Sequence, residues 1–132
     1  MTRFFIALAT TISLFATPAQ AYAKSSIEGR WKNGKMEIVI SPCGRSLCGT
    51  VVKASPKQQA KAERGSGTDL IGARLITDIR PNGPQTYRAN VYLADRDMNA
   101  SGTIRQINRN RLNVRGCVWG FICKSTNWDR IS

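Results

Sequence analysis

The sequence predicts an all-β protein, an antiparallel up-and-down barrel of about eight strands with one short helix or loop inserted. Short segments with apolar residues at every second position recur along the chain, and turn residues separate them. The part that follows an N-terminal leader, roughly 110 residues, is long enough for one domain. Because an open sheet of this kind would expose unpaired edges, closure into a barrel is the economical arrangement.

Residues 1–23 have the features of a secretory signal peptide. Arg3 precedes an apolar core, which is followed by Pro18 and by small residues at every second position up to residue 23. The core is shorter than the roughly 20 residues that a membrane-spanning helix needs, and it contains threonine and serine. We therefore expect cleavage after Ala21 or Ala23, a periplasmic or secreted protein with no transmembrane segment, and a single β-barrel domain over residues 24–132.

The composition restricts the chemistry of the mature chain. The formal charge of +12 becomes +11 when Arg3 is removed with the leader, so the mature protein is strongly basic. It contains no histidine, the most common general base and metal ligand. Asp95 and Asp97 flank Arg96 in an expected turn, where acidic residues are typical, and no serine stands in a nucleophile motif. We expect no catalytic residues, no cofactor and no metal.

The first strands are expected around the segment 35–41, where Met36, Ile38 and Ile40 alternate with more polar positions. Asn33-Gly34 is the turn before it. The segment "SPCGRSLCG" that follows contains the first pair of the four cysteines, which are Cys43, Cys48, Cys117 and Cys123.

An even number of cysteines in an exported protein indicates disulfides. The gaps of four and five residues do not fit a zinc knuckle or a redox Cys-x-x-Cys. Three pairings are open to the sequence. We favour the local one, in which each pair closes its own hairpin.

A short helix is expected after Cys48, the second cysteine of the first pair. Ser55 is a candidate N-cap, Pro56 fits the first helical position, helix-forming residues continue to Arg64, and Gly65 is a stop signal. The segment has almost no apolar face, so a solvated helix or a mobile loop is expected.

Further alternating segments follow at 71–81, 86–94 and 111–117. Turn signals at 81–84 and at Ser101-Gly102 are expected to separate strands. In the first of these segments one face is predicted to be polar and the other apolar. The polar set is Arg74, Asp78 and Arg80, and the apolar set is Ala73, Leu75, Thr77 and Ile79.

The two ends of the domain carry related tripeptides, Gly29-Arg30-Trp31 and Trp128-Asp129-Arg130. In a closed barrel the first and last strands become neighbours. We expect Gly29, Trp31, Trp128 and Arg130 to close the barrel, with Trp31 covering one end and the guanidinium of Arg130 over its indole. Ordinary strand positions are the alternative interpretation.

Four arginines form the candidate anion-binding set of the chain. Their odd-numbered positions would place much of the set on one sheet face, where it would attract phosphates; they are Arg105, Arg109, Arg111 and Arg115. An exported protein meets anionic envelope components first, so nucleic acid is not the expected partner. A solvated surface is the alternative.

The quoted motifs resemble a known family. "EGRWKNGKMEIVISPCGRSLCGTVV", "LIGARLI", "NRLNVRGC" and the terminal "STNWDRI" are similar to the small exported bacterial proteins of domain-of-unknown-function family 2147. The resemblance runs from Gly29 to Arg130 and implies a lipocalin-like barrel that binds a ligand. The chain departs from the family pattern at "KQQAKAERGSGTD" and at "YLADRDMNASGT", which lacks a proline that members usually carry.

Two functions are open at this point. The first is a lipocalin-like protein that binds an unknown small molecule, anionic or amphipathic, in the barrel mouth. The second is a non-enzymatic envelope-interaction module whose basic face binds a polyanion or a protein, with the barrel packed solid. The sequence leaves the oligomeric state open. Because an eight-stranded barrel is either filled by side chains or able to hold one small ligand, an interior cavity would distinguish the two.

Overall fold

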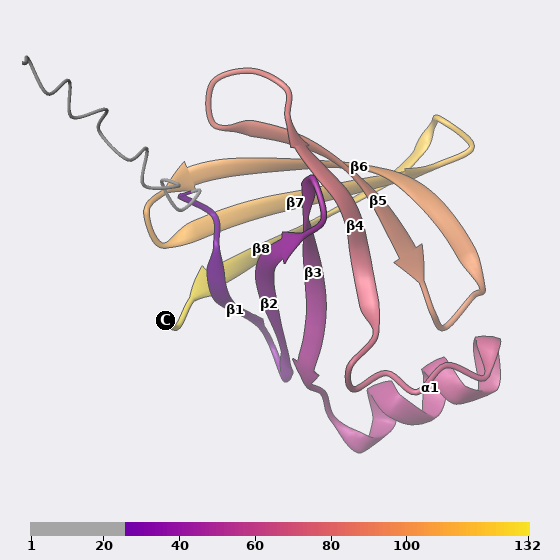
Figure 1. The fold of residues 1–132 in the computed structure, drawn as a ribbon. Coiled ribbons are helices and arrows are strands. Elements are labelled where there is room, and N and C mark those ends of the chain that lie inside the picture. Colours follow the sequence, from indigo (N-terminus) through magenta and orange to yellow (C-terminus); the bar gives the residue numbers. More distant parts are fainter. Residues whose placement is uncertain (1–25) are drawn as a thin grey trace, which may run out of the picture.

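The computed structural model describes residues 26–132 and forms a closed antiparallel barrel of eight strands with one helix (Figure 1). Each strand pairs with the next, and β1 also pairs with β8, where Trp31 lies opposite Arg130. The predicted fold is therefore confirmed, whereas the predicted signal peptide lies outside the described residues. The elements are β1 Gly29–Asn33, β2 Met36–Cys43, β3 Ser46–Lys53, α1 Pro56–Ser66, β4 Arg74–Pro81, β5 Thr86–Leu93, β6 Met98–Asn108, β7 Arg111–Val118 and β8 Ile122–Arg130.

The helix α1 lies across one end of the barrel, at the bottom of Figure 1. Its start is the predicted one: Ser55 accepts a hydrogen bond from the Gln58 backbone, and the Gln58 side chain accepts one from Ser55. Its predicted end at Gly65 is wrong, because the helix continues through Ser66 and is ended by the C-cap Gly67, whose φ is 68°. The helix is also docked on the barrel, since Ala62 is buried. Within residues 26–132 there is no helix long and apolar enough to cross a membrane.

The predicted faces of β4 are wrong in part. Ile76 and Ile79 are both buried although they are three residues apart. Asp78 between them has a φ of 54°, and the pairing of β4 with β5 shifts between Thr77 and Arg80. Such a bulge adds a residue to one strand and reverses the alternation beyond it. Ile76, rather than Thr77, therefore faces the core.

The predicted turn at Ser101-Gly102 is also wrong. Both residues lie inside β6, opposite Asn90 and Ala89 of β5. A side chain at Gly102 would meet the Val91 side chain at 2.7 Å, so glycine is needed there for close packing between strands rather than for a turn. The turn between β5 and β6 instead contains Asp95, Arg96 and Asp97, as the turn preferences of aspartate indicated.

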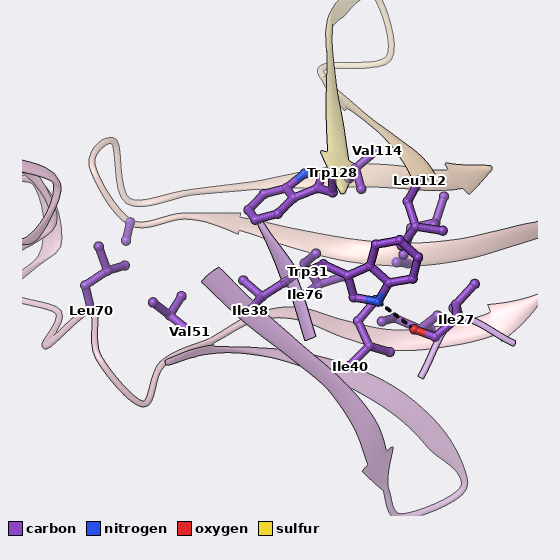
Figure 2. Packing of buried hydrophobic residues seen from close by; sticks show 14 of the residues in the cluster. Ile27, Trp31, Ile38, Ile40, Val51, Leu70, Ile76, Leu112, Val114 and Trp128 are labelled. Carbon is purple, nitrogen blue, oxygen red and sulfur yellow. Dashed lines mark hydrogen bonds between the residues drawn. The ribbon is translucent and has the colours of Figure 1, made fainter. Parts of the chain in front are cut away.

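The core runs through the barrel from the end opposite α1, where the two tryptophans lie, to Ala62 of α1. Figure 2 shows Trp31 and Trp128 beside one another, surrounded by aliphatic side chains, with the Trp31 indole nitrogen donating to the Ile27 carbonyl at 2.9 Å. Leu70 and Val51 lie apart from this group, nearer to α1. The fully buried side chains are Ile27, Trp31, Ile38, Ile40, Val51, Ile79, Ile104 and Leu112.

Candidate ligand-binding site

The end of the barrel opposite α1 is sealed. The guanidinium carbon of Arg130 lies 4.3 Å from the ring centroid of Trp31. Arg130 also donates to the carbonyls of Arg109 at 2.9 Å and Glu28 at 2.8 Å, and to that of Ser26. Gly29 has a φ of 135°, and a side chain there would meet the Ser132 backbone. These contacts join the start of β1, the end of β8 and the β6–β7 turn, and they cover the Trp31 side of the core. A cavity of about 750 Å³ lies beside them at this end, and the residues that line it are all polar, among them Glu28, Gln106 and Arg109.

The end beneath α1 is different, because small inward-facing residues leave space. Ala100 of β6 lies opposite Val91 of β5, Gly116 of β7 lies opposite Gly102 of β6, and both Ala100 and Gly116 line the smaller of the two cavities at this end. A Cβ added to Gly116 would find its nearest neighbour, the Ala100 Cβ, at 3.7 Å, an ordinary contact distance. The sequence therefore leaves room at this end of the barrel.

Two adjoining cavities occupy this space. One, of about 340 Å³, lies between the barrel and α1 and is lined by Met36, Ala62, Leu70 and Leu75 among others. The second, of about 240 Å³, lies between β5 and β8. Its apolar lining consists mainly of Val91, Ala100, Val114, Val118 and Ile122. Leu93, Asp95 and Lys124 line both cavities, so the two open on a common mouth.

The helix is held over this mouth by close backbone contact. A Cβ at Gly65 would lie 2.2 Å from the Asp95 carbonyl oxygen, so only glycine allows the helix to approach the β5–β6 turn this closely. The Ser66 hydroxyl donates to the Ala94 carbonyl at 2.7 Å. Gly65, which looked like a stop signal in the sequence, is therefore a packing residue that positions the cover.

The mouth carries polar groups of both signs. Lys124 of β8 lies opposite Gly116 of β7 and lines both cavities. Lys61 of α1 lines the larger cavity. Asp95 lies in the same mouth, with the guanidinium of Arg96 at 4.0 Å from its carboxylate. An apolar space with two lysines at its opening suits an amphipathic molecule with a negative head group.

A separate ion pair lies on β1 and β2. Arg30 donates to Glu37 at 2.8 Å and holds the pKa of that carboxyl below its usual value, with Lys53 and Lys32 adding to the effect. Within residues 26–132 no group of three or more histidine, cysteine or acidic side chains is placed to hold a metal ion.

The four cysteines form two local disulfides. Cys43 is joined to Cys48 across the β2–β3 hairpin, and Cys117 to Cys123 across the β7–β8 hairpin. The first lies at the sealed end, because the β2–β3 turn and the β6–β7 turn share that end of the barrel. The second lies beside the mouth, where Cys123 lines the smaller cavity.

The four arginines of the candidate anion-binding set are all exposed. Arg105 and Arg115 lie on the outer face of β6 and β7, while Arg109 is in the turn between these strands and Arg111 pairs with Asp129 at 3.0 Å. The strand pairing adds two arginines that the sequence did not indicate. Arg80 lies opposite Arg88, and Arg88 and Arg115 both lie opposite Thr103.

Comparison with known proteins agrees with this architecture. Residues 29–130 match the model of a family described as uncharacterized proteins conserved in bacteria, domain-of-unknown-function family 2147. The chain belongs to this family. Family 2147 was the one that the sequence motifs resembled. No curated protein matches the chain at a significant level.

A solved structure shares the fold of this family 2147 member. It is protein HP1028 of Helicobacter pylori, described as belonging to the lipocalin family. The two chains are 13% identical, the match covers 80% of this chain and 82% of the other, and the TM-score is 0.60. The family 2147 chain therefore has a lipocalin-like barrel.

Proposed function

We propose that this protein is an exported, non-enzymatic carrier or sensor that binds a small amphipathic anion in the mouth beneath α1. The single observation that supports this most strongly is the pair of adjoining apolar cavities with Lys124 at their common opening. A barrel packed solid would be expected of a purely structural module. The proposal includes removal of the leader after Ala21 or Ala23, which N-terminal sequencing of the exported protein would test.

The chemistry of the mouth defines the ligand class. The apolar lining takes an alkyl or ring portion, because burying apolar surface is the main driving force for such ligands. The Lys124 ammonium at the opening favours a carboxylate, sulfate or phosphate head group. Asp95 and Arg96 beside it carry opposite charges 4.0 Å apart, so Lys124 gives the opening its net positive charge and its preference for anions.

Titration calorimetry with three ligands of equal chain length tests this proposal. We expect decanoate to bind, decanol to bind more weakly and decyltrimethylammonium not to bind. Lys124→Met should weaken decanoate binding and leave decanol binding unchanged. Arg105→Ala, which removes a cation on the outer face of the barrel, is the matched control and should change neither. Equal binding of all three amphiphiles, or loss of decanoate binding in the control alone, would contradict the proposed site.

A second candidate function rests on the cross-strand arginines. Arg80, Arg88 and Arg115 lie in one row across three strand pairs of the outer face, with Thr103 between the last two. Asp78 partners Arg80 at 2.6 Å, whereas no acidic residue lies opposite Arg88 or Arg115 in the strand pairing, so these two cations leave the row positively charged. We infer that the outer face binds a polyanionic envelope polymer. Heparin affinity that falls steeply with salt and that Arg88→Ala plus Arg115→Ala abolishes would support it; unchanged retention would refute it.

A further inference from the structure

The β7–β8 hairpin ends in an apolar tip that projects from the barrel, at the upper right of Figure 1. We define the tip as Trp119, Gly120, Phe121 and Ile122. The side chains of Trp119 and Phe121 are 74% and 76% exposed, and that of Ile122 is 50% exposed. The disulfide Cys117–Cys123 closes the hairpin directly below the tip. Three large apolar side chains are thus held in water on a covalently closed hairpin.

The backbone of the tip shows that Trp119 is not the locally favoured residue. Its φ is 55°, in the left-handed region, and that of Gly120 is 78°. Asparagine, aspartate and glycine accept this conformation most easily, and a bulky side chain there is strained. A residue that is both strained and exposed gains nothing for folding. This outlier therefore indicates a role in contact with something outside the molecule.

The size of the tip favours a lipid surface over a second copy of the chain. Three such side chains offer an apolar area on the order of 400 Å². A stable dimer usually buries about 800 Å² on each partner. Tryptophan prefers the interface between lipid and water, where its ring is partly apolar and partly polar.

Charge complementarity indicates the kind of lipid. Lys124 and Arg96 line the cavity wall that runs into the tip, and Arg115 is exposed two residues before Cys117. Without Arg3 of the leader, the formal charge of +12 becomes +11. The carboxylate of Asp95, 4.0 Å from the guanidinium of Arg96, offsets part of this positive charge. Basic side chains behind an apolar insert are typical of proteins that bind anionic bilayers.

We propose that the β7–β8 tip docks the protein on a bilayer with anionic head groups by inserting Trp119 and Phe121 into its interface. The proposal is independent of the ligand in the barrel mouth. It concerns Trp119 and Phe121, which line neither cavity, although Ile122 at the base of the tip also lines the smaller one. Docking by this tip would also place the open mouth toward the membrane, since Val118 and Ile122 continue from the cavity wall into the tip.

The tryptophans provide a direct readout. Trp31 is fully buried and Trp128 is 9% exposed, so Trp119 is the exposed one of the three. We expect its emission to shift to shorter wavelength when vesicles of phosphatidylglycerol and phosphatidylcholine are added, and not with phosphatidylcholine alone. Trp119→Phe should retain vesicle binding in sedimentation and lose the emission shift.

The decisive variant is Trp119→Asn with Phe121→Ser. Asparagine suits the left-handed position, so this variant should fold at least as well as the wild type. Its binding to anionic vesicles should be weaker by at least roughly tenfold, because two aromatic side chains no longer leave water. Ile107→Ser is the matched control, since Ile107 is also 50% exposed but lies on β6, and it should bind as the wild type does.

Three results would overturn the proposal. One is vesicle binding without an emission shift of the wild-type protein. Another is unchanged binding of the Trp119→Asn, Phe121→Ser variant, which would mean that arginines elsewhere hold the vesicle. The third is an emission shift that grows with protein concentration in the absence of lipid, which would assign the tip to a second copy. Decanoate binding in solution by the tip variant keeps this test separate from that of the ligand site.

Discussion

Replacing Arg130 with alanine tests whether the seal at the closed end stabilises the barrel. The guanidinium makes three hydrogen bonds to carbonyls and lies 4.3 Å from the Trp31 ring centroid. A hydrogen bond of a charged group contributes about 1.5–3 kcal/mol when buried, and a cation–π contact about 0.5–2 kcal/mol. Arg130 is half-buried, so water replaces part of what is lost. We expect a loss of about 2–4 kcal/mol in the free energy of unfolding.

Urea unfolding followed by tryptophan fluorescence measures this loss. Arg130→Lys should lose less than Arg130→Ala, because the ammonium keeps its charge over the ring but cannot form the three-way fork of hydrogen bonds. Arg105→Ala removes an exposed arginine from β6 and is expected to change stability by less than about 0.5 kcal/mol. A value for Arg130→Ala as small as that of Arg105→Ala would refute the assigned role of the seal.

The remaining predictions concern glycines, a disulfide and a carboxylate. Gly116→Leu should abolish decanoate binding without loss of stability, because its side chain would enter the cavity, whereas Gly102→Ala should cost about 1–3 kcal/mol through its clash with the neighbouring strand; calorimetry and urea unfolding check both. Cys117→Ser with Cys123→Ser should cost about 2 kcal/mol by the loop-entropy relation, measured against the oxidised wild type. Because its folded pKa is lowered, Glu37 stabilises the protein at neutral pH, and this contribution is lost as the pH falls below the usual glutamate range. Glu37→Gln should therefore be less stable than the wild type at pH 7, with the difference closing in acid; a constant difference would contradict the ion pair.

The fold could be predicted from the sequence because its determinants are local and repeated. Alternation in segments such as 35–41 and 86–94 depends on which face of a strand is buried, and turn residues marked most of the ends. Closure followed from the cost of free edges, and β1 and β8 are indeed neighbours.

The errors have a common physical origin. The bulge at Asp78 and the close packing of Gly102 depend on residues of neighbouring strands, which no local pattern contains. Gly65 looked like a helix stop because glycine serves both as a terminator and as a site of close approach. Sequence alone did not distinguish the two uses.

The candidate site was predicted less completely than the fold. The barrel mouth was expected as its place, but the residues that form it come from α1, β2 and β4–β8, and Lys124 was not anticipated. An inward lysine opposite an inward glycine was visible only in the register of β7 and β8. The exposure of the β7–β8 tip likewise depends on how far this hairpin extends beyond the barrel.

The most direct test of the central claim is to locate a bound amphiphile by methyl nuclear magnetic resonance. Decanoate added to the protein should shift the methyl signals of Val91, Leu93 and Val114, which line the open end. The methyls of Ile40 and Ile104, packed in the sealed half, should shift little. The largest shifts at Ile40 and Ile104, or no saturable shift at any of the five, would contradict a ligand site beneath α1.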